Sequence, residues 1–187
     1  PLRVALIGYG AAGRIFHAPL IRHAPGLELA LVVSRRRDAL AQALPGVEVV
    51  GLAEEALLRA DIDLVVIASP NATHAPLAEA ALRAGRHVVV DKPFTLSLAD
   101  ARRLAALAAA SGRVLAVFQN RRWDGDFLAL HEVLASGRIG RLTWLESRFD
   151  RFRPQVQDRW RERADEGGHR TTFTIGWPLS SLYSASS

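Results

Sequence analysis

Three short segments carry residues whose types and spacing suit nucleotide binding and proton transfer. The first is Gly8-Tyr9-Gly10-Ala11-Ala12-Gly13, which has the G-x-G-x-x-G spacing of a dinucleotide-binding loop. In such a loop Gly8 permits a tight turn, Gly10 lets the backbone approach a pyrophosphate, and Gly13 allows a helix to pack closely on a strand. The helix N-terminus would then receive the phosphate groups. A glycine-rich turn without a ligand and a methyltransferase loop are the alternatives.

The choice of dinucleotide depends on the segment Ser34-Arg35-Arg36-Arg37, which follows a second apolar run. NAD sites usually offer an acidic residue here to the ribose hydroxyls, whereas serine and arginine can donate to a 2′-phosphate. The segment therefore predicts NADP in preference to NAD. Alternatively, these arginines form the exposed start of a helix, for which Asp38 is a candidate cap.

The third segment, Asp91-Lys92-Pro93, holds the single lysine among the 24 basic residues. A lysine can release a proton when it is buried, whereas an arginine stays charged. A proton shuttle beside a hydride transfer needs the group that can release its proton, so Lys92 is predicted to be the catalytic acid or base. A salt-bridged surface lysine is the alternative.

A further polar segment, Ser69-Pro70-Asn71-Ala72-Thr73-His74, directly follows the fourth apolar run. Ligands of open α/β sheets bind at the carboxyl ends of the strands, so these side chains should border the same crevice. Asn71 and Thr73 are also candidate helix caps, and His74 could be an exposed residue of the first turn.

These segments are positioned by alternating strand and helix patterns. Short apolar runs rich in β-branched residues predict buried parallel strands at Leu2–Ile7, Leu27–Val33, Val47–Val50, Ile62–Ala68, His87–Val90 and Val114–Phe118. Helices are predicted at Ala12–His23, Asp38–Leu44, Ala53–Ala60, His74–Arg83 and Ser97–Ala110. The first of these helices has Ile15, Phe16 and Leu20 as its apolar side, and Pro19 is expected to make it irregular. Ser97 and Asp100 fit a capping box, and Gly112 follows that helix. The alternation predicts an α/β fold built on a doubly wound parallel Rossmann sheet.

Composition excludes several classes of protein. The 187 residues contain no apolar run long enough to span a bilayer and no signal-peptide pattern, which predicts a soluble cytoplasmic protein. They also contain no cysteine, so no thiolate metal site is expected, and no other metal site is predicted. The net charge of +5 reflects 23 arginines and is weak evidence for nucleic-acid binding. Residues 148–163 are rich in arginine but also hold acidic residues, so they indicate a mixed-charge surface. The last eight residues are mostly serine with little apolar content and should be poorly ordered.

Taken together, the motifs resemble the Gfo/Idh/MocA oxidoreductases, which include glucose–fructose oxidoreductase and the inositol dehydrogenases. The resemblance rests on the glycine loop followed by Phe16-His17-Ala18-Pro19-Leu20, on Ser69-Pro70-Asn71 with His74, and on Asp91-Lys92-Pro93. It is supported by Gln119-Asn120-Arg121-Arg122-Trp123-Asp124 and by Arg153-Pro154 with Arg159-Trp160-Arg161. The family's usual signature is Glu-Lys-Pro, and the Asp-Lys-Pro form resembles its scyllo-inositol dehydrogenase-like branch.

The resemblance implies transfer of hydride between a nicotinamide and a secondary hydroxyl or carbonyl of a sugar or cyclic polyol. It implies a cis peptide before Pro93, and substrate contacts from Lys92, Asn120 and Arg122. The residues expected to contact the dinucleotide are Gly8, Tyr9, Gly10, Ala12, Gly13, Ser34, Arg35, Arg36, Ser69, Pro70, Asn71, His74, Asp91, Lys92, Pro93 and Asn120.

One departure from the family concerns the second domain. Members continue after a paired glycine with D-x-x-x-H, but Gly167-Gly168 is followed by His169-Arg170-Thr171-Thr172 without that acid and histidine. We therefore expect a dinucleotide-binding domain at 1–121 and an incomplete start of a substrate domain at 122–187, through truncation or a change of reading frame. Homo-oligomers would require a complete second domain. The alternative function is an inactive dinucleotide-binding module.

Overall fold

Six parallel strands form the framework of the first of two compact units, Pro1–Gln119. The computed structural model describes residues 1–146. The strands are β1 (Leu2–Ile7), β2 (Leu27–Val33), β3 (Glu48–Val50), β4 (Leu64–Ile67), β5 (His87–Asp91) and β6 (Leu115–Phe118). Their order in the sheet is β3-β2-β1-β4-β5-β6, so successive strands are added outward on one side of β1 as far as β3 and then, from β4 on, outward on its other side.

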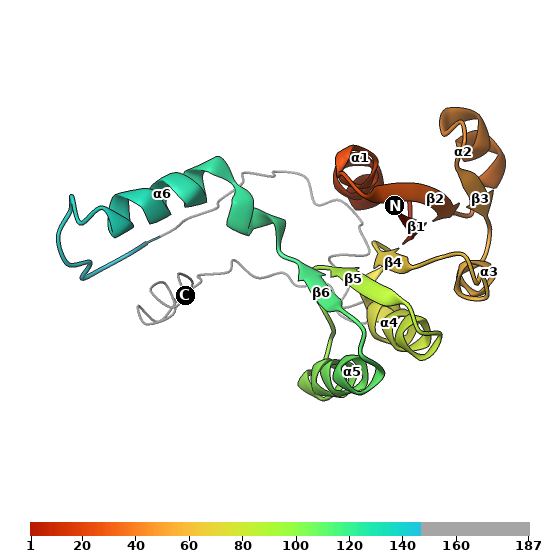
Figure 1. The fold of residues 1–187 in the computed structure, drawn as a ribbon. Coiled ribbons are helices and arrows are strands. Elements are labelled where there is room, and N and C mark those ends of the chain that lie inside the picture. Colours follow the sequence, from red (N-terminus) through yellow and green to blue (C-terminus); the bar gives the residue numbers. More distant parts are fainter. Residues whose placement is uncertain (147–187) are drawn as a thin grey trace, which may run out of the picture. The chain divides into compact units, whose positions relative to one another are not determined.

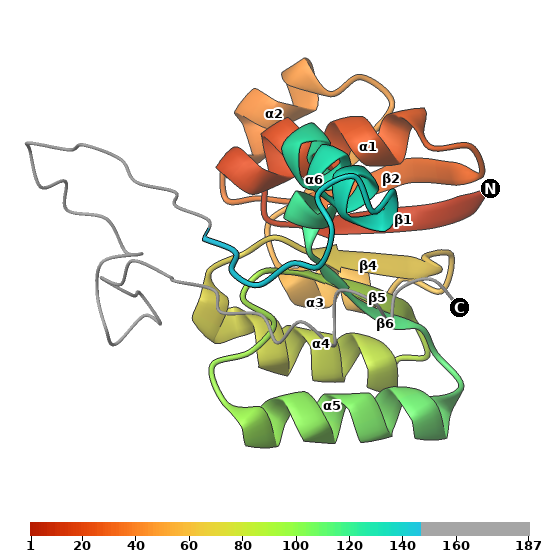
Figure 2. The same ribbon diagram turned by 90° about the vertical axis from the view of Figure 1, so that its left-hand side faces the viewer.

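Helices cover both faces of this sheet (Figures 1 and 2). One face carries α1 (Ala18–His23) and α2 (Arg37–Ala43), and the other carries α3 (Ala53–Leu57), α4 (His74–Arg83) and α5 (Leu98–Ser111). Each face has its own apolar core: Ile21 and Leu40 pack on one, and Leu82 and Leu104 on the other. The doubly wound parallel sheet predicted from the sequence is confirmed.

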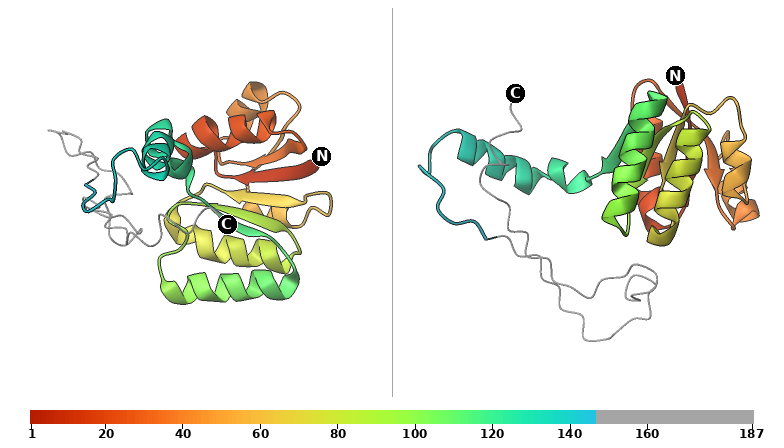
Figure 3. Two further views of the ribbon diagram at one scale, coloured as in Figure 1. Left: turned by 60° about the vertical axis from the view of Figure 1, so that its left-hand side comes forward. Right: turned by 90° about the horizontal axis from the view of Figure 1, so that it is seen from below.

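Ser97 and Gly112 end α5 as predicted, but the predicted capping box is only half formed, because the Asp100 carboxylate accepts from the Ser97 hydroxyl at 2.7 Å and not from its backbone N–H. The Ser97 hydroxyl oxygen accepts a hydrogen bond from the Asp100 backbone N–H at 3.1 Å, and Gly112 ends the helix with a φ of 61°. Capping of this kind satisfies backbone groups that have no partner inside the helix. The helix lies beside α4 on the same face of the sheet (Figure 3).

The helical run after β1 differs from the prediction. It begins with a π-helical turn, η1 (Gly13–His17), in which the Ala18 N–H donates to the Gly13 carbonyl oxygen, and it continues as α1. Pro19 has no N–H to donate within the run, which agrees with the predicted irregularity. The predicted apolar side is wrong, because its side chains face solvent. Ile15 is 54% exposed, Phe16 is 42% exposed and Leu20 is 54% exposed. The extra residue in the π turn brings other side chains to the core instead.

Two predicted helix caps are also wrong. Asp38 lies in the first turn of α2, whose N-cap is Arg36. Thr73 stands at the N-cap of α4 after the 3-10 turn η2 (Asn71–Thr73), but its side chain does not cap that helix. Its hydroxyl donates to the Pro70 carbonyl oxygen at 2.7 Å, and a local bond of this kind competes with capping.

The described part of the second unit begins at Asn120. It contains the 3-10 turn η3 (Asn120–Trp123) and the helix α6 (Gly125–Ala135), with an ion pair of 2.6 Å between Arg121 and Asp124. The predictions about residues 148–163, Gly167-Gly168 and the serine-rich tail lie outside the described residues. The domain limits at residues 121 and 122 stay a prediction.

Within residues 1–146, no helix is both long enough and apolar enough to cross a membrane. The same part of the chain has no cluster of three or more histidine or acidic side chains that could hold a metal ion.

Candidate active site

The predicted motifs follow strands that end at one edge of the sheet. Ile7 is paired with Val33 on one side and with Ile67 on the other, and Asp91 is paired with Phe118. All neighbouring strands are parallel, so the glycine loop and the segments after β2, β4 and β5 meet at this edge. The edge includes the point between β1 and β4 where ligands of doubly wound sheets bind.

The glycine loop has the shape of a dinucleotide loop. Gly8 has a φ of 98°, and a Cβ there would lie 2.6 Å from the Ala68 carbonyl oxygen. A Cβ on Gly13 would overlap the Gly8 carbonyl oxygen. A Cβ on Gly10, by contrast, would meet no atom of the described residues within 4 Å. The first and third glycines are therefore required by the fold, whereas the second borders open space that a pyrophosphate could occupy.

The basic segment after β2 reaches this loop. The Arg36 guanidinium donates to the Tyr9 carbonyl oxygen at 3.4 Å, and the Arg36 backbone N–H donates to the Ser34 hydroxyl oxygen at 3.2 Å. Arg35 is exposed. The structure thus brings Ser34 and Arg36 beside the glycine loop, where a 2′-phosphate would need donors.

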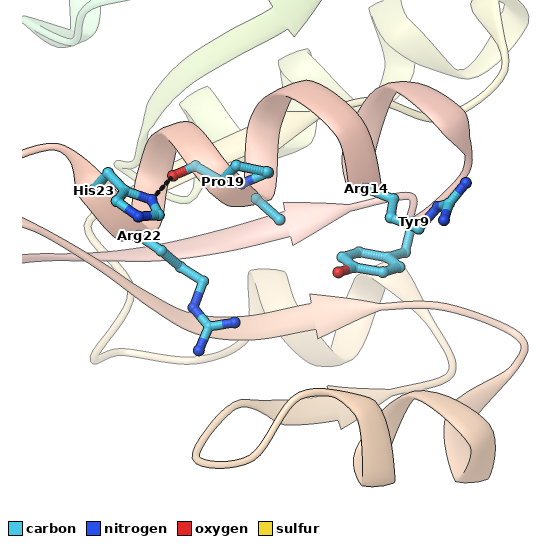
Figure 4. Close-up of a pocket in the computed structure, with 6 residues that line it drawn as sticks. Tyr9, Arg14, Pro19, Arg22 and His23 are labelled. Atoms are coloured by element: carbon cyan, nitrogen blue, oxygen red, sulfur yellow. Dashed lines mark hydrogen bonds between the residues drawn. The ribbon is translucent and has the colours of Figure 1, made fainter.

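A shallow hollow adjoins the loop beside the helical run (Figure 4). Its lining consists of Tyr9, Arg14, Ala18, Pro19, Arg22 and His23. In Figure 4 the Tyr9 ring and the Arg22 side chain extend to the same side of the helical run. Arg14 and Arg22 were not among the predicted site residues, although their spacing of eight, about two helical turns, is a signal for one side of a helix.

At the end of β4, His74 is buried and bonded to two loops. Its side chain is 1% exposed, with Nδ1 2.8 Å from the Pro93 carbonyl oxygen and Nε2 2.9 Å from the Ser69 carbonyl oxygen. The alternative of an exposed first-turn residue is therefore wrong. Because both ring nitrogens face backbone carbonyls, His74 can influence a cofactor only by holding the loops after β4 and β5.

The segment after β5 contains the cis peptide Lys92-Pro93 that the resemblance implied. Lys92 is exposed, and its side chain makes no salt bridge within residues 1–146. The described residues therefore do not provide the burial that the argument for a proton-releasing lysine assumed. They do leave the amine accessible to a ligand at the sheet edge.

Asp91 and His17 lie next to this lysine. The Lys92 backbone N–H donates to Asp91 Oδ1 at 2.8 Å, and Asp91 Oδ2 lies 3.9 Å from His17 Nε2. Burial pushes the pKa of the Asp91 carboxyl upward, but His17 and the Lys92 N–H outweigh that effect, so the pKa lies below its ordinary value. His17 was not predicted as a site residue, because its place in the helical run does not show which residues of β5 and β6 it will meet.

The family is decided by the sequence comparison. The model for the oxidoreductase family with an NAD-binding Rossmann fold, Gfo/Idh/MocA, matches residues 2–119, and the model for that family's C-terminal domain matches residues 127–176. The chain belongs to the Gfo/Idh/MocA family. It is 55% identical over 166 residues to the uncharacterized oxidoreductase YdgJ of Escherichia coli K12, covering 89% of this chain and 48% of that protein.

Two further members of the family or its fold are informative. The scyllo-inositol 2-dehydrogenase (NADP(+)) IolW of Bacillus subtilis is 33% identical over 162 residues, covering 87% of this chain and 45% of that protein. A solved structure of an NAD-binding protein from Listeria innocua superposes with a TM-score of 0.82 at 35% identity, covering 89% of this chain and 49% of the other. The chain thus spans about half the length of the relatives it matches.

Of the other predicted residues of this Gfo/Idh/MocA chain, Ala12 stands at the N-cap of η1, Pro70 stands at the N-cap of η2 and Asn71 lies in η2. Asn120 and Arg122 belong to the second unit. Both lie in η3, and Arg122 is exposed. Their contacts with substrate or cofactor, like those of the residues in the first unit, stay predictions.

Proposed function

We propose that the protein is an NADP-dependent oxidoreductase acting on a secondary hydroxyl or carbonyl of a sugar or cyclic polyol. The observation that carries this proposal is the contact of the basic segment with the glycine loop, where the Arg36 guanidinium donates to the Tyr9 carbonyl oxygen next to the open space at Gly10. Backbone can approach a pyrophosphate there, and donors stand where an adenosine 2′-phosphate would lie.

The preference for NADP is supported by the absence of an acidic residue at the end of β2. The three residues after Val33 are Ser34, Arg35 and Arg36, which can donate to a phosphate and do not repel it. The name of IolW, a relative described as NADP-dependent, is in keeping with this choice.

We assign the proton transfer of this reaction to Lys92. When bound, the nicotinamide accepts or delivers the hydride. In the oxidation direction Lys92 in its neutral amine form would take the proton of the hydroxyl as its carbon loses hydride, and in the reduction direction Lys92 in its ammonium form would return the proton to the carbonyl oxygen. The exposed amine follows β5 directly and can reach a ligand at the strand ends.

Cofactor affinity tests the first part of the proposal. We expect NADPH to bind this chain more tightly than NADH, as measured by nucleotide fluorescence titration. Arg36→Ala should weaken NADPH binding about tenfold, because it removes a charge-assisted donor, and should change NADH binding little. Arg37→Ala is the matched control. Equal or inverted affinities for the two nucleotides would contradict the assignment of NADP.

Turnover tests the second part. In polyol oxidation assays with NADP, Lys92→Arg should keep the affinity for cofactor and abolish turnover, because arginine retains charge but not the removable proton. Turnover retained by this variant would refute the role of Lys92.

A second candidate function is a dinucleotide-binding module without catalysis, which the exposure of Lys92 favours, because the described residues do not bury the side chain assigned to proton transfer. NADPH binding without saturable turnover of any polyol would select this function over the first.

A further inference from the structure

Two polar side chains are buried in the described part of the chain, and both lie beside Asp91-Lys92-Pro93. These are His17, 3% exposed, and His74, 1% exposed. Both ring nitrogens of His74 face carbonyl oxygens at hydrogen-bond distance, whereas His17 Nε2 has no hydrogen-bond partner within residues 1–146. A buried nitrogen without a hydrogen-bond partner costs stability, which makes this ring a candidate for a functional role.

The backbone holds this imidazole in place. His17 ends the π turn η1, an arrangement that often occurs at functional sites. Its ring packs on that of Phe118 at the end of β6, with 4.4 Å between ring centroids and an interplanar angle of 48°. The ring thus lies between the helical run that carries it and Phe118, at the end of the strand next to β5.

The nearest charged group to this ring is Asp91. The distance of 3.9 Å from His17 Nε2 to Asp91 Oδ2 is within the range of an ion pair but longer than a hydrogen bond. The other oxygen of the same carboxylate accepts the Lys92 N–H. Among the described residues, the ionisable groups that act on Asp91 are His17 from η1 and the adjacent Lys92.

We propose that His17 is a positioning residue that acts through Asp91 on Lys92. The imidazole holds the carboxylate in its charged form and in one orientation, and the carboxylate in turn holds the peptide that carries the lysine. This inference rests on the proposed function only for its final step, the use of Lys92 in proton transfer.

The first experiment measures the carboxylate itself. In the wild-type chain, NMR titration of the Asp91 carboxyl carbon should give a pKa below the ordinary value. His17→Phe retains an aromatic ring against Phe118 but removes the nitrogen. Burial raises the pKa of the Asp91 carboxyl, and in this variant His17 no longer lowers it. The pKa of Asp91 should therefore rise, and the chemical shift of the Lys92 amide should change as well.

Three further variants make this experiment specific. His17→Gln, which retains a neutral donor, should raise the pKa of Asp91 less than His17→Phe does. His131→Phe, in the second unit, should leave the pKa of Asp91 unchanged. Where His17→Phe does not fold, Asp91→Asn reports on the same pair from the other side, because the His17 ring resonances should move in that variant. An unchanged Asp91 pKa in folded His17→Phe, or unchanged His17 resonances in Asp91→Asn, would overturn the proposal.

A second experiment separates this inference from the proposed function. In polyol assays with NADP, His17→Phe should lower kcat about tenfold and leave KM for the cofactor within about twofold, as expected for a displaced catalytic group. A rise in that KM with kcat unchanged would contradict the positioning role. If the chain bound no NADPH while the Asp91 pKa still responded to His17, the proposed function would fall and the pairing would stand.

Discussion

Three glycines of one loop lack a side chain for three different reasons. Gly8 has a backbone conformation that other residues rarely adopt, and Gly13 lies against the Gly8 carbonyl. Gly10 has neither constraint, since a Cβ there would meet nothing within 4 Å among the described atoms. Under the proposed function, the space at Gly10 is left for the pyrophosphate.

Alanine substitutions separate these reasons. Gly10→Ala should change the free energy of unfolding by less than about 0.5 kcal/mol and weaken NADPH binding about tenfold or more, because the methyl group enters the space for the pyrophosphate. Gly13→Ala should instead destabilise the chain by about 1–3 kcal/mol, because its methyl group overlaps backbone. Chemical denaturation and nucleotide titration measure the two effects. Wild-type affinity in Gly10→Ala would show that no pyrophosphate approaches this residue.

The sequence could predict these glycines but not the burial of His17 and His74. Spacing within a loop is local, so the roles of Gly8 and Gly13 followed from the motif. The surroundings of His17 and His74 depend on where β5 and β6 lie, and no local pattern carries that information. Lys92 was singled out by its residue type, yet its exposure was not expected.

At the scale of elements, the strands were predicted more accurately than the helices. Central parallel strands are buried on both faces, so continuous apolar runs predict them, as β1 and β2 show. The ends of α5 were predicted because both caps depend on residue type, the hydroxyl of Ser97 and the left-handed backbone of Gly112. The π turn η1 could not be predicted from the sequence, since its hydrogen-bond register depends on packing against the sheet.

The N-cap of α5 gives a quantitative test at this scale. Ser97→Ala should lower the free energy of unfolding by about 1 kcal/mol, because the Asp100 N–H loses its acceptor. The matched control on the same helix is Ser111→Ala, which removes only a hydroxyl bonded to the Ala108 carbonyl oxygen. Urea denaturation at equal protein concentration measures both. Equal losses in the two variants would show that the cap does not contribute.

At the scale of the whole molecule, the excess of positive charge favours the more highly charged dinucleotide. The chain carries a formal charge of +5, and NADPH has one phosphate group more than NADH. Surface attraction of this kind is screened over about 8 Å at physiological ionic strength. Added salt should therefore weaken NADPH binding more steeply than NADH binding.

Titrations of both nucleotides at increasing sodium chloride concentration test this expectation. The affinity for NADPH should approach that for NADH as salt rises, and Arg36→Ala should reduce the difference between the two slopes. Parallel salt dependences would mean that the extra phosphate contacts no basic side chain.

The exposed position of Lys92 also makes it a selective chemical handle. It is the only lysine in the sequence, so an amine-reactive dye would mark one side chain, apart from the chain's own N-terminal amine. That side chain follows β5 directly, at the edge of the sheet where the glycine loop begins. A fluorophore attached there would report occupancy of the candidate site without any engineered cysteine, and protection from the dye by NADPH would map that site in a single mass spectrum.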